Sequence, residues 1–447
     1  MLYHLHEMQR SLLTPLMQWA DASSKLFTNP VSPLAHTPFA QRIAAGYELM
    51  YRLGKDYEKP AFDIDTTTVN GADVGIIEQV EVNKPFCRLI HFKKDLSEKA
   101  IAALKQPKVL LVAPLSGHHS TLLRDTVRGL LTDHDVYITD WINPRDVSLA
   151  QGRFGFDEYV QHVIDFIVAL GPNTHVLAVC QPTVATLAAV SLMAADDHPL
   201  QPASMTLMAG PIDTRINPTS VNVLAKSKPI EWFERNLISA VPWGFAGAGR
   251  RVYPGHTQLM AFMSMNPTRH FDAFEDMVYQ RAKGDPAKAE AIRVFYEEYF
   301  ATMDLTAEFY LETVDTIFQQ HALPLHELEV RGRRVDPSLI RRTALLTVEG
   351  ERDDICAVGQ TLAAQELCNK LRPYMKTHHV QTGVGHYGVF NGRRWERHIY
   401  PRVRAMIHDN EPSAIVINAR AQPLQSLAPL ARPVVPRMDL NVQSEGP

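Results

Sequence analysis

The most constraining feature of the chain is the stretch VLAVCQPTVA at residues 176–185. An apolar run ends at a single cysteine, Cys180, and a segment of small residues that favours a helix begins directly after it. A strand that turns sharply into a helix forms a nucleophile elbow, in which the residue at the turn stands clear of the sheet. Cys180 is therefore either a catalytic thiolate or a small buried apolar residue.

Length and composition limit the class of protein. The chain has 447 residues, 45% hydrophobic and 21% charged, which is the balance of a globular protein. This length allows one large α/β domain with insertions, or two domains. The net charge of −4 gives no electrostatic reason to expect nucleic-acid binding. No run approaches the ~18 apolar residues of a membrane span, and residues 1–24 do not resemble a signal peptide.

The cysteines are few for this length and show no C-x-x-C spacing; they are Cys87, Cys180, Cys356 and Cys368. The sequence thus predicts neither a disulfide framework nor a zinc site, and we expect no metal and no cofactor. Cys87 alternates with its neighbours in a predicted strand and is interpreted as structural. A reducing cytoplasm fits this usage best.

Strand and helix patterns alternate through much of the chain. Residues 62–93 predict antiparallel strands with turns at Asn70-Gly71 and at residues 83–85. Apolar runs then predict buried strands over residues 109–113, 136–139, 175–179, 205–209, 344–348 and 379–381. Helical patterns lie between them, including residues 157–170, 183–195 and 357–371. This order predicts an α/β-hydrolase fold with a mostly parallel, doubly wound sheet and a large helical cap insertion.

The predicted organisation has five parts. They are amphipathic helices (residues 1–60), the first half of the core (61–215), a helical cap rich in aromatic residues (216–335), the second half of the core (336–410) and a proline-rich tail (411–447). The aromatic residues of the cap form its own core or line an apolar substrate groove. The tail has little periodicity and is expected to be extended or disordered.

Two apolar stripes mark the helices of residues 1–60. The first spans residues 2–20, with a kink or break at Pro15, and the second runs through Phe39, Ile43, Tyr47 and Tyr51. Such stripes favour docking onto the main domain. The alternative is adsorption to an apolar surface such as a lipid or polymer particle.

Three residues carry the predicted chemistry. A thiolate nucleophile needs a base and an acid that orients the base, and in α/β-hydrolases these follow in the order nucleophile, acid, histidine. Cys180, Asp353 and His386 occur in this order, each just after a predicted strand. Asp354 remains an alternative to Asp353 at this point. Because the nucleophile is a cysteine, the predicted mechanism passes through a thioester.

The neighbouring loops supply the remaining candidates. The backbone N–H of Gln181 is expected to form one half of an oxyanion hole, with Leu115 or Ser116 supplying the second N–H. His118 and His119 follow in the same loop. We interpret them as candidate substrate-binding residues, with ordinary surface histidines as the alternative.

Three motifs carry a resemblance to a known family: VCQP at residues 179–182, GPIDTR at 210–215 and GHYGVF at 385–390. Together they resemble the intracellular polyhydroxyalkanoate (poly-3-hydroxybutyrate, PHB) depolymerases of bacteria, which are related to polyhydroxyalkanoate synthases. The resemblance covers residues 1 to about 409. It implies a triad of Cys180, Asp353 and His386, and so favours Asp353 over Asp354. Residues 140–144, DWINP, are similar to a segment shared by synthases and depolymerases.

The resemblance implies a cytoplasmic, granule-associated ester hydrolase that cleaves PHB in storage granules to 3-hydroxybutyrate and oligomers. A synthase-like acyltransferase is an alternative, although synthases have a longer N-terminal region and a glycine-flanked cysteine. A non-catalytic granule-surface binding protein and a hydrolase of soluble thioesters or small esters are two others. The acyl acceptor (water or a thiol such as coenzyme A), the preferred polymer side chain and the oligomeric state stay open.

Overall fold

The computed structural model describes residues 37–55, 57–265, 267–283 and 285–411, together with residues 3, 7, 15, 16, 18–24 and 27. Most of the predicted helix over residues 2–20 lies outside this set, and so does the predicted tail after Glu411. Residues 18–24 are helical. No helix in the part of the chain described here is long and apolar enough to cross a bilayer.

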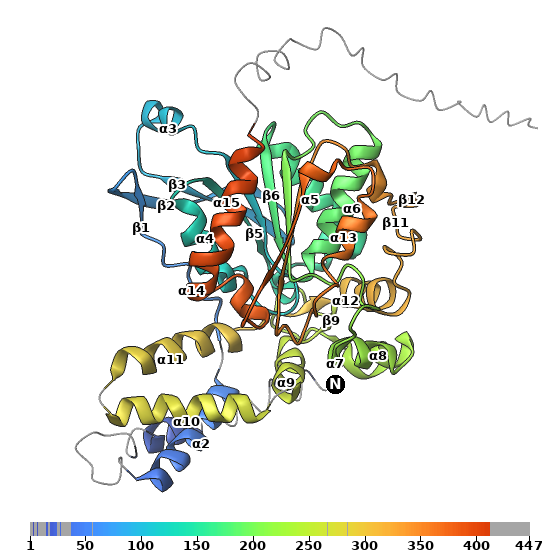
Figure 1. The fold of residues 1–447 in the computed structure, drawn as a ribbon. Helices are drawn as coiled ribbons and strands as arrows, with labels where there is room; N and C mark the ends of the chain where they lie inside the picture. The colour runs from blue at the N-terminus through green and yellow to red at the C-terminus, as the bar shows by residue number, and fades with distance from the viewer. Residues whose placement is uncertain are drawn as a thin grey trace, which may run out of the picture. The chain divides into compact units, whose positions relative to one another are not determined.

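A nine-stranded sheet forms the core, in the order β1-β2-β3-β5-β4-β6-β7-β13-β14 (Figure 1). The antiparallel strands are β1 (Thr66–Val69), β2 (Ala72–Asn83) and β3 (Cys87–Lys94), and β3 pairs antiparallel with β5. All later neighbours are parallel: β5 (Asp135–Trp141), β4 (Lys108–Val112), β6 (Thr174–Val179), β7 (Ser204–Met208), β13 (Ala344–Gly350) and β14 (Lys376–Gln381). The predicted fold class, an α/β-hydrolase, is confirmed.

Helices cover both faces of the sheet because its central strands are apolar on both sides. Every residue of β6 and β7 is buried. In Figure 1, α4 (Arg124–Leu131) and α15 (Tyr400–Asp409) lie on one face, and α5 (Phe156–Leu170) and α6 (Pro182–Ala195) lie on the other. A short α14 (Gly392–Arg394) and a π-helical turn precede α15, and the face formed by Trp395, Ile399, Val403 and Ile407 is buried.

One helix prediction in the core needs correction, and one helix there was not predicted. The helix expected over residues 357–371 is limited to α13, Ala363–Leu367. The Glu349 side chain accepts hydrogen bonds from the backbone N–H of Gly359, Thr361 and Leu362, and these bonds hold the preceding residues in turns. An unpredicted helix, α3 (Glu98–Leu104), follows β3, and the Ser97 hydroxyl caps its first turn.

The predicted cap, residues 216–335, is not wholly helical. Its helices are α7 (Ser220–Lys226), α8 (Ile230–Leu237), α9 (Gly255–Met265), α10 (Pro267–Lys283), α11 (Pro286–Phe300) and α12 (Ala307–Thr313). Short strands lie among them: β8 (Ser239–Ala240), β9 (Arg251–Tyr253) and β10 (Leu305–Thr306) form one small sheet, and β11 (Glu329–Val330) pairs with β12 (Arg333–Arg334).

Helix α2 (Pro38–Gly54) packs beside α10, and α10 packs on α11 (Figure 1). We call these three helices the arm. The predicted docking of α2 onto the main domain is therefore corrected to docking onto the insertion. The predicted apolar stripe is also shifted, because Phe39 is 76% exposed, whereas Ala44, Glu48 and Arg52 are buried. Alanine allows close approach of the helices, and the two charged residues are paired.

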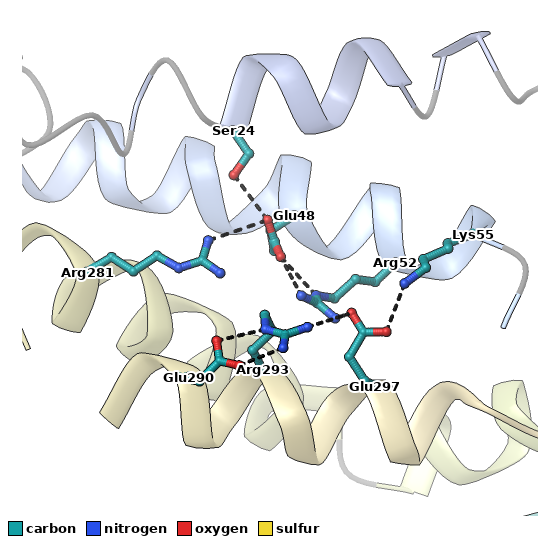
Figure 2. A network of polar contacts seen from close by, with 8 residues as sticks. All are labelled: Ser24, Glu48, Arg52, Lys55, Arg281, Glu290, Arg293 and Glu297. Carbon is teal, nitrogen blue, oxygen red and sulfur yellow. Dashed lines mark hydrogen bonds and ion pairs between the residues drawn. The ribbon is translucent and has the colours of Figure 1, made fainter. Parts of the chain in front are cut away.

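Figure 2 shows the ion-pair network that joins the helices of the arm. Arg52 donates to Glu48 on its own helix at 2.9 Å and to Glu297 of α11 at 2.9 Å. Lys55 also donates to Glu297, at 2.8 Å, and Arg281 of α10 lies 3.9 Å from Glu48. The network thus connects residues that are more than two hundred positions apart in the sequence.

Candidate active site

Cys180 lies at the turn between β6 and α6, as the sequence predicts. Its φ of 68° falls in the left-handed region that a side chain disfavours. The N–H of Cys180 donates to the carbonyl of Met208 at 2.8 Å, and the Cys180 carbonyl accepts from the N–H of Thr183 at 3.2 Å. Gly210 packs so closely against this turn that a Cβ there would lie 1.9 Å from Thr183 Oγ1. The end of β7 and the residue Gly210 just after it therefore hold the strained turn.

His386 and Asp353 meet at the same edge of the sheet. His386 Nδ1 lies 2.8 Å from Asp353 Oδ2. The other oxygen of Asp353 accepts hydrogen bonds from the N–H of Ile355 at 2.9 Å and of Cys356 at 2.8 Å. Asp354 is exposed. Asp353 is therefore the carboxylate that orients His386, which answers the choice that the residues alone left open.

The electrostatics of the site favour a thiolate. A hydrogen bond from the Cys356 thiol, opposed by burial and aided by the nearby His386 and the Gln181 N–H, lowers the pKa of Cys180 well below its usual range. Burial opposes a charge on His386, but the Asp353 carboxylate and the Cys180 sulfur raise its pKa well above the usual value. Both shifts favour a pair formed by a thiolate and an imidazolium.

A cavity of about 540 Å³ opens at this pair, and Cys180 and His386 both line it. This is the size of a typical small-molecule site. The walls are largely aromatic and aliphatic, and most of them come from the insertion: Phe233, Tyr253, Phe262, Phe309, Tyr310 and Phe318. Other aromatic residues pack within the arm instead, such as Phe274, Tyr296 and Phe300. Both predictions for the aromatic residues of the cap therefore apply: some line the cavity, and others form the core of the arm.

The three residues predicted to form an oxyanion hole are all at the cavity. Leu115, Ser116 and Gln181 all line the cavity, and the Gln181 N–H points to the Cys180 sulfur. The loop of residues 114–120 is braced from behind, because Ser120 and Lys59 both donate to Asp140, each at 2.6 Å. This bracing gives the DWINP segment a structural role.

The two histidines of this loop differ. His118 lines the cavity, where its ring lies 5.4 Å from that of Phe262 and its Nε2 lies 3.1 Å from the carbonyl oxygen of Tyr299. Burial lowers the pKa of His118 to about 4, so its ring is neutral. His119 is buried but is not among the residues that line the cavity. The prediction that His119 contacts substrate is therefore not supported by the cavity.

Sequence reasoning missed several polar residues at the cavity, among them Cys356 and Thr313. Cys356 lines the cavity next to Cys180, although its place three residues after Asp353 was a usable signal. Thr313 also lines it, and its hydroxyl has no hydrogen-bond partner among the described residues. Nothing in the sequence distinguishes Thr313 from other threonines of the insertion.

Comparison with known proteins gives one family. Residues 209–411 match the family described as "PHB de-polymerase C-terminus". This match confirms the resemblance to PHB depolymerases and the prediction of a carboxylic ester hydrolase. No match was found among curated protein sequences.

Solved structures with a similar course of the chain include two hydrolases. One is the monoacylglycerol lipase of Paleococcus ferrophilus, at 13% identity and a TM-score of 0.41, covering 68% of this chain and 96% of that one. The other is the 2-hydroxy-6-oxo-6-phenylhexa-2,4-dienoate hydrolase of a Rhodococcus strain, at 13% identity and a TM-score of 0.40, covering 75% of this chain and 99% of that one. At these values the likeness carries no argument about activity.

Proposed function

Since residues 209–411 match the PHB depolymerase C-terminal family, we propose that the chain hydrolyses the ester bonds of PHB in storage granules through a thioester on Cys180, releasing 3-hydroxybutyrate and oligomers. The observation that carries the proposal is the arrangement of Cys180, His386 and Asp353. Cys180 lies at the cavity wall with a backbone φ of 68°. His386 is next to its sulfur, and His386 Nδ1 lies 2.8 Å from Asp353 Oδ2.

The residues suggest the following sequence of steps. The Cys180 thiolate attacks the ester carbonyl, and the N–H of Gln181 with that of Leu115 or Ser116 binds the oxyanion. His386 then gives its proton to the departing alkoxide, so that the C–O bond breaks and a thioester remains. Water attacks the thioester while His386 takes its proton, and the C–S bond breaks with its electron pair returning to sulfur.

The apolar cavity supports a polyester as the substrate. A chain of 3-hydroxybutyryl units carries a methyl branch on each unit and ester oxygens between them, so most of its surface is apolar. The cavity offers aromatic walls to the branches and few polar groups for the oxygens. An enzyme is therefore favoured over a catalytically inactive granule-binding protein. Such a protein would not need a pair like Cys180 and His386 at the wall of a cavity.

Exposed apolar side chains support granule association. Leu224 of α7 lines the cavity and is 57% exposed, and Val223 beside it is 58% exposed. Met260 of α9 is 60% exposed, next to the cavity residue Ala261. Apolar residues at the cavity mouth favour contact with a hydrophobic polymer surface.

Native amorphous granules provide the test, with released 3-hydroxybutyrate as the readout. We expect Cys180→Ala to lose turnover by at least about a thousandfold and still to sediment with the granules. Cys180→Ser is expected to retain a small residue of activity, because serine demands a stronger base. Unchanged turnover by Cys180→Ala would show that the thioester route is wrong. Adding coenzyme A to the wild type distinguishes hydrolysis from transfer to a thiol, which would yield the coenzyme A thioester.

A further inference from the structure

Cys356 occupies a position that the proposed mechanism does not use. It lies in the loop after β13, where its backbone N–H donates to Asp353 Oδ1 at 2.8 Å. The N–H of Ile355 donates to the same oxygen at 2.9 Å. The Asp353 carboxylate therefore fixes the backbone of this turn at both Ile355 and Cys356. Its other oxygen is bonded to His386. Asp353 thus positions the imidazole and Cys356 together.

The side chain of Cys356 reaches the nucleophile. Cys356 and Cys180 line the same cavity, and their thiol groups lie close enough to interact. Cys356 is only 3% exposed, so the contact is shielded from bulk water. Cys87 and Cys368 are also free and buried, but neither lines the cavity. Only one cysteine pair among the described residues therefore faces the substrate space.

The direction of the hydrogen bond follows from which sulfur holds the charge. Cys180 is adjacent to the imidazolium of His386, whereas Cys356 is near the carboxylates of Asp353 and Glu349. The contact with Cys180, burial and these carboxylates raise the pKa of Cys356 well above its usual range. Cys356 therefore keeps its proton at neutral pH, and its S–H donates to the Cys180 sulfur.

We propose that Cys356 is a further catalytic residue, whose S–H donates a hydrogen bond to Cys180 Sγ and holds the nucleophile as a thiolate. When Sγ bonds to the ester carbonyl carbon, its electron pair enters the S–C bond and the hydrogen bond weakens. When water displaces the thioester, the pair returns to Sγ and the hydrogen bond forms again. Cys356 thus stabilises sulfur as the leaving group of the second step.

The assignment rests on the proposed nucleophile, but its test needs no substrate. Iodoacetamide alkylation of Cys180 is followed against pH by peptide mapping, in the wild type, Cys356→Ala, Cys356→Val and Cys356→Ser. Valine fills the volume without a donor, and serine keeps a donor. Alanine and valine are expected to raise the midpoint of alkylation by about one pH unit, and serine to leave it near the wild type. Cys368→Ala is the matched control, with no expected change.

The outcomes separate the two proposals. A midpoint that stays low in Cys356→Ala and Cys356→Val would overturn the role of Cys356 and leave the Cys180 thiolate intact. A shift in Cys356→Ser as large as that in Cys356→Ala would overturn the hydrogen-bond donor. If wild-type Cys180 itself titrates like an ordinary thiol, then the thiolate nucleophile of the proposed function fails. Where alanine prevents folding, valine and serine alone decide.

Discussion

The buried charges at the cavity and those within the arm are satisfied differently. In the arm, Glu48, Arg52 and Glu297 find partners within the protein, and both oxygens of each carboxylate are engaged. At the cavity, both oxygens of Asp353 are engaged in the same way. The sulfur of Cys180, however, lies on the wall of an open apolar space.

The difference separates a structural from a reactive use of charge. A network closed within the protein fixes helices relative to one another, and it is costly to break because a lone charge then stays buried. A thiolate that faces a cavity has free lone pairs for an incoming carbonyl carbon. At the cavity, the Cys180 sulfur is thus left free to react, whereas Glu48, Arg52 and Glu297 of the arm are paired within the protein.

The largest expected effect comes from changing Asp353, the carboxylate that is paired with His386 at the cavity. Asp353→Asn keeps an oxygen for the N–H groups of Ile355 and Cys356, but turns an amide N–H toward His386 Nδ1. The imidazole then adopts the wrong tautomer and loses the charge that stabilises its protonated form. We expect kcat on PHB granules to fall by about a thousandfold or more, with little change in the free energy of unfolding.

Asp354→Asn is the matched control for this prediction, since Asp354 is exposed. It is expected to leave kcat close to the wild-type value. Equal losses in the two variants would mean that the neighbouring carboxylates act together, and that the separation seen between them has no functional meaning.

The next effect, on stability, belongs to the arm. Arg52→Met removes the cation between the buried Glu48 and the half-buried Glu297. Breaking such a pair costs about 3 kcal/mol or more, measured as a loss in the free energy of unfolding in urea. The control Arg42→Met breaks the ion pair with Glu275, where Arg42 is 69% exposed, and is expected to cost less than about 1 kcal/mol. Similar costs for both variants would remove the distinction between a closed network and a surface pair.

The sequence predicted the sheet and the three proposed catalytic residues because both depend on local patterns. Buried strands are short apolar runs, and parallel strands place their carboxyl ends at one edge of the sheet. Cys180, the pair Asp353 and Asp354, and His386 each follow such a run, so the pattern brings these positions together, and the family resemblance then favoured Asp353. The cysteine after β6 was informative only in combination with the other two residues.

The remaining features depend on contacts that are distant in sequence. The buried face of α2 is set by Glu297, whose pairing with Arg52 no local pattern reveals, and the apolar stripe through Phe39 was therefore misleading. The helix over residues 357–371 was expected from its periodicity, but the Glu349 side chain of β13 holds its first part in turns. Which residues of the 114–120 loop face the cavity likewise depends on the insertion that packs against them.

The smallest expected effect concerns the side chain of Gln181, which lines the cavity as Cys180 does. The Gln181 carboxamide is 7% exposed and lines the cavity, and neither its nitrogen nor its oxygen has a hydrogen-bond partner among the described residues. A buried amide of this kind destabilises the free protein. An ester carbonyl of bound substrate can accept from its nitrogen, which gives the side chain a role beyond that of its backbone N–H.

Gln181→Leu is therefore expected to act in opposite directions on binding and on stability. The loss of one hydrogen bond to substrate should lower kcat/KM for 3-hydroxybutyrate oligomers by about tenfold, while the free energy of unfolding rises by up to about 1 kcal/mol. The control is Gln360→Leu, because Gln360 donates to Asn222 at 2.9 Å and to the Ile216 carbonyl at 3.1 Å and does not line the cavity. That variant should lose stability. If Gln181→Leu loses as much stability, then the Gln181 amide stabilises the free protein and has no separate role in binding substrate.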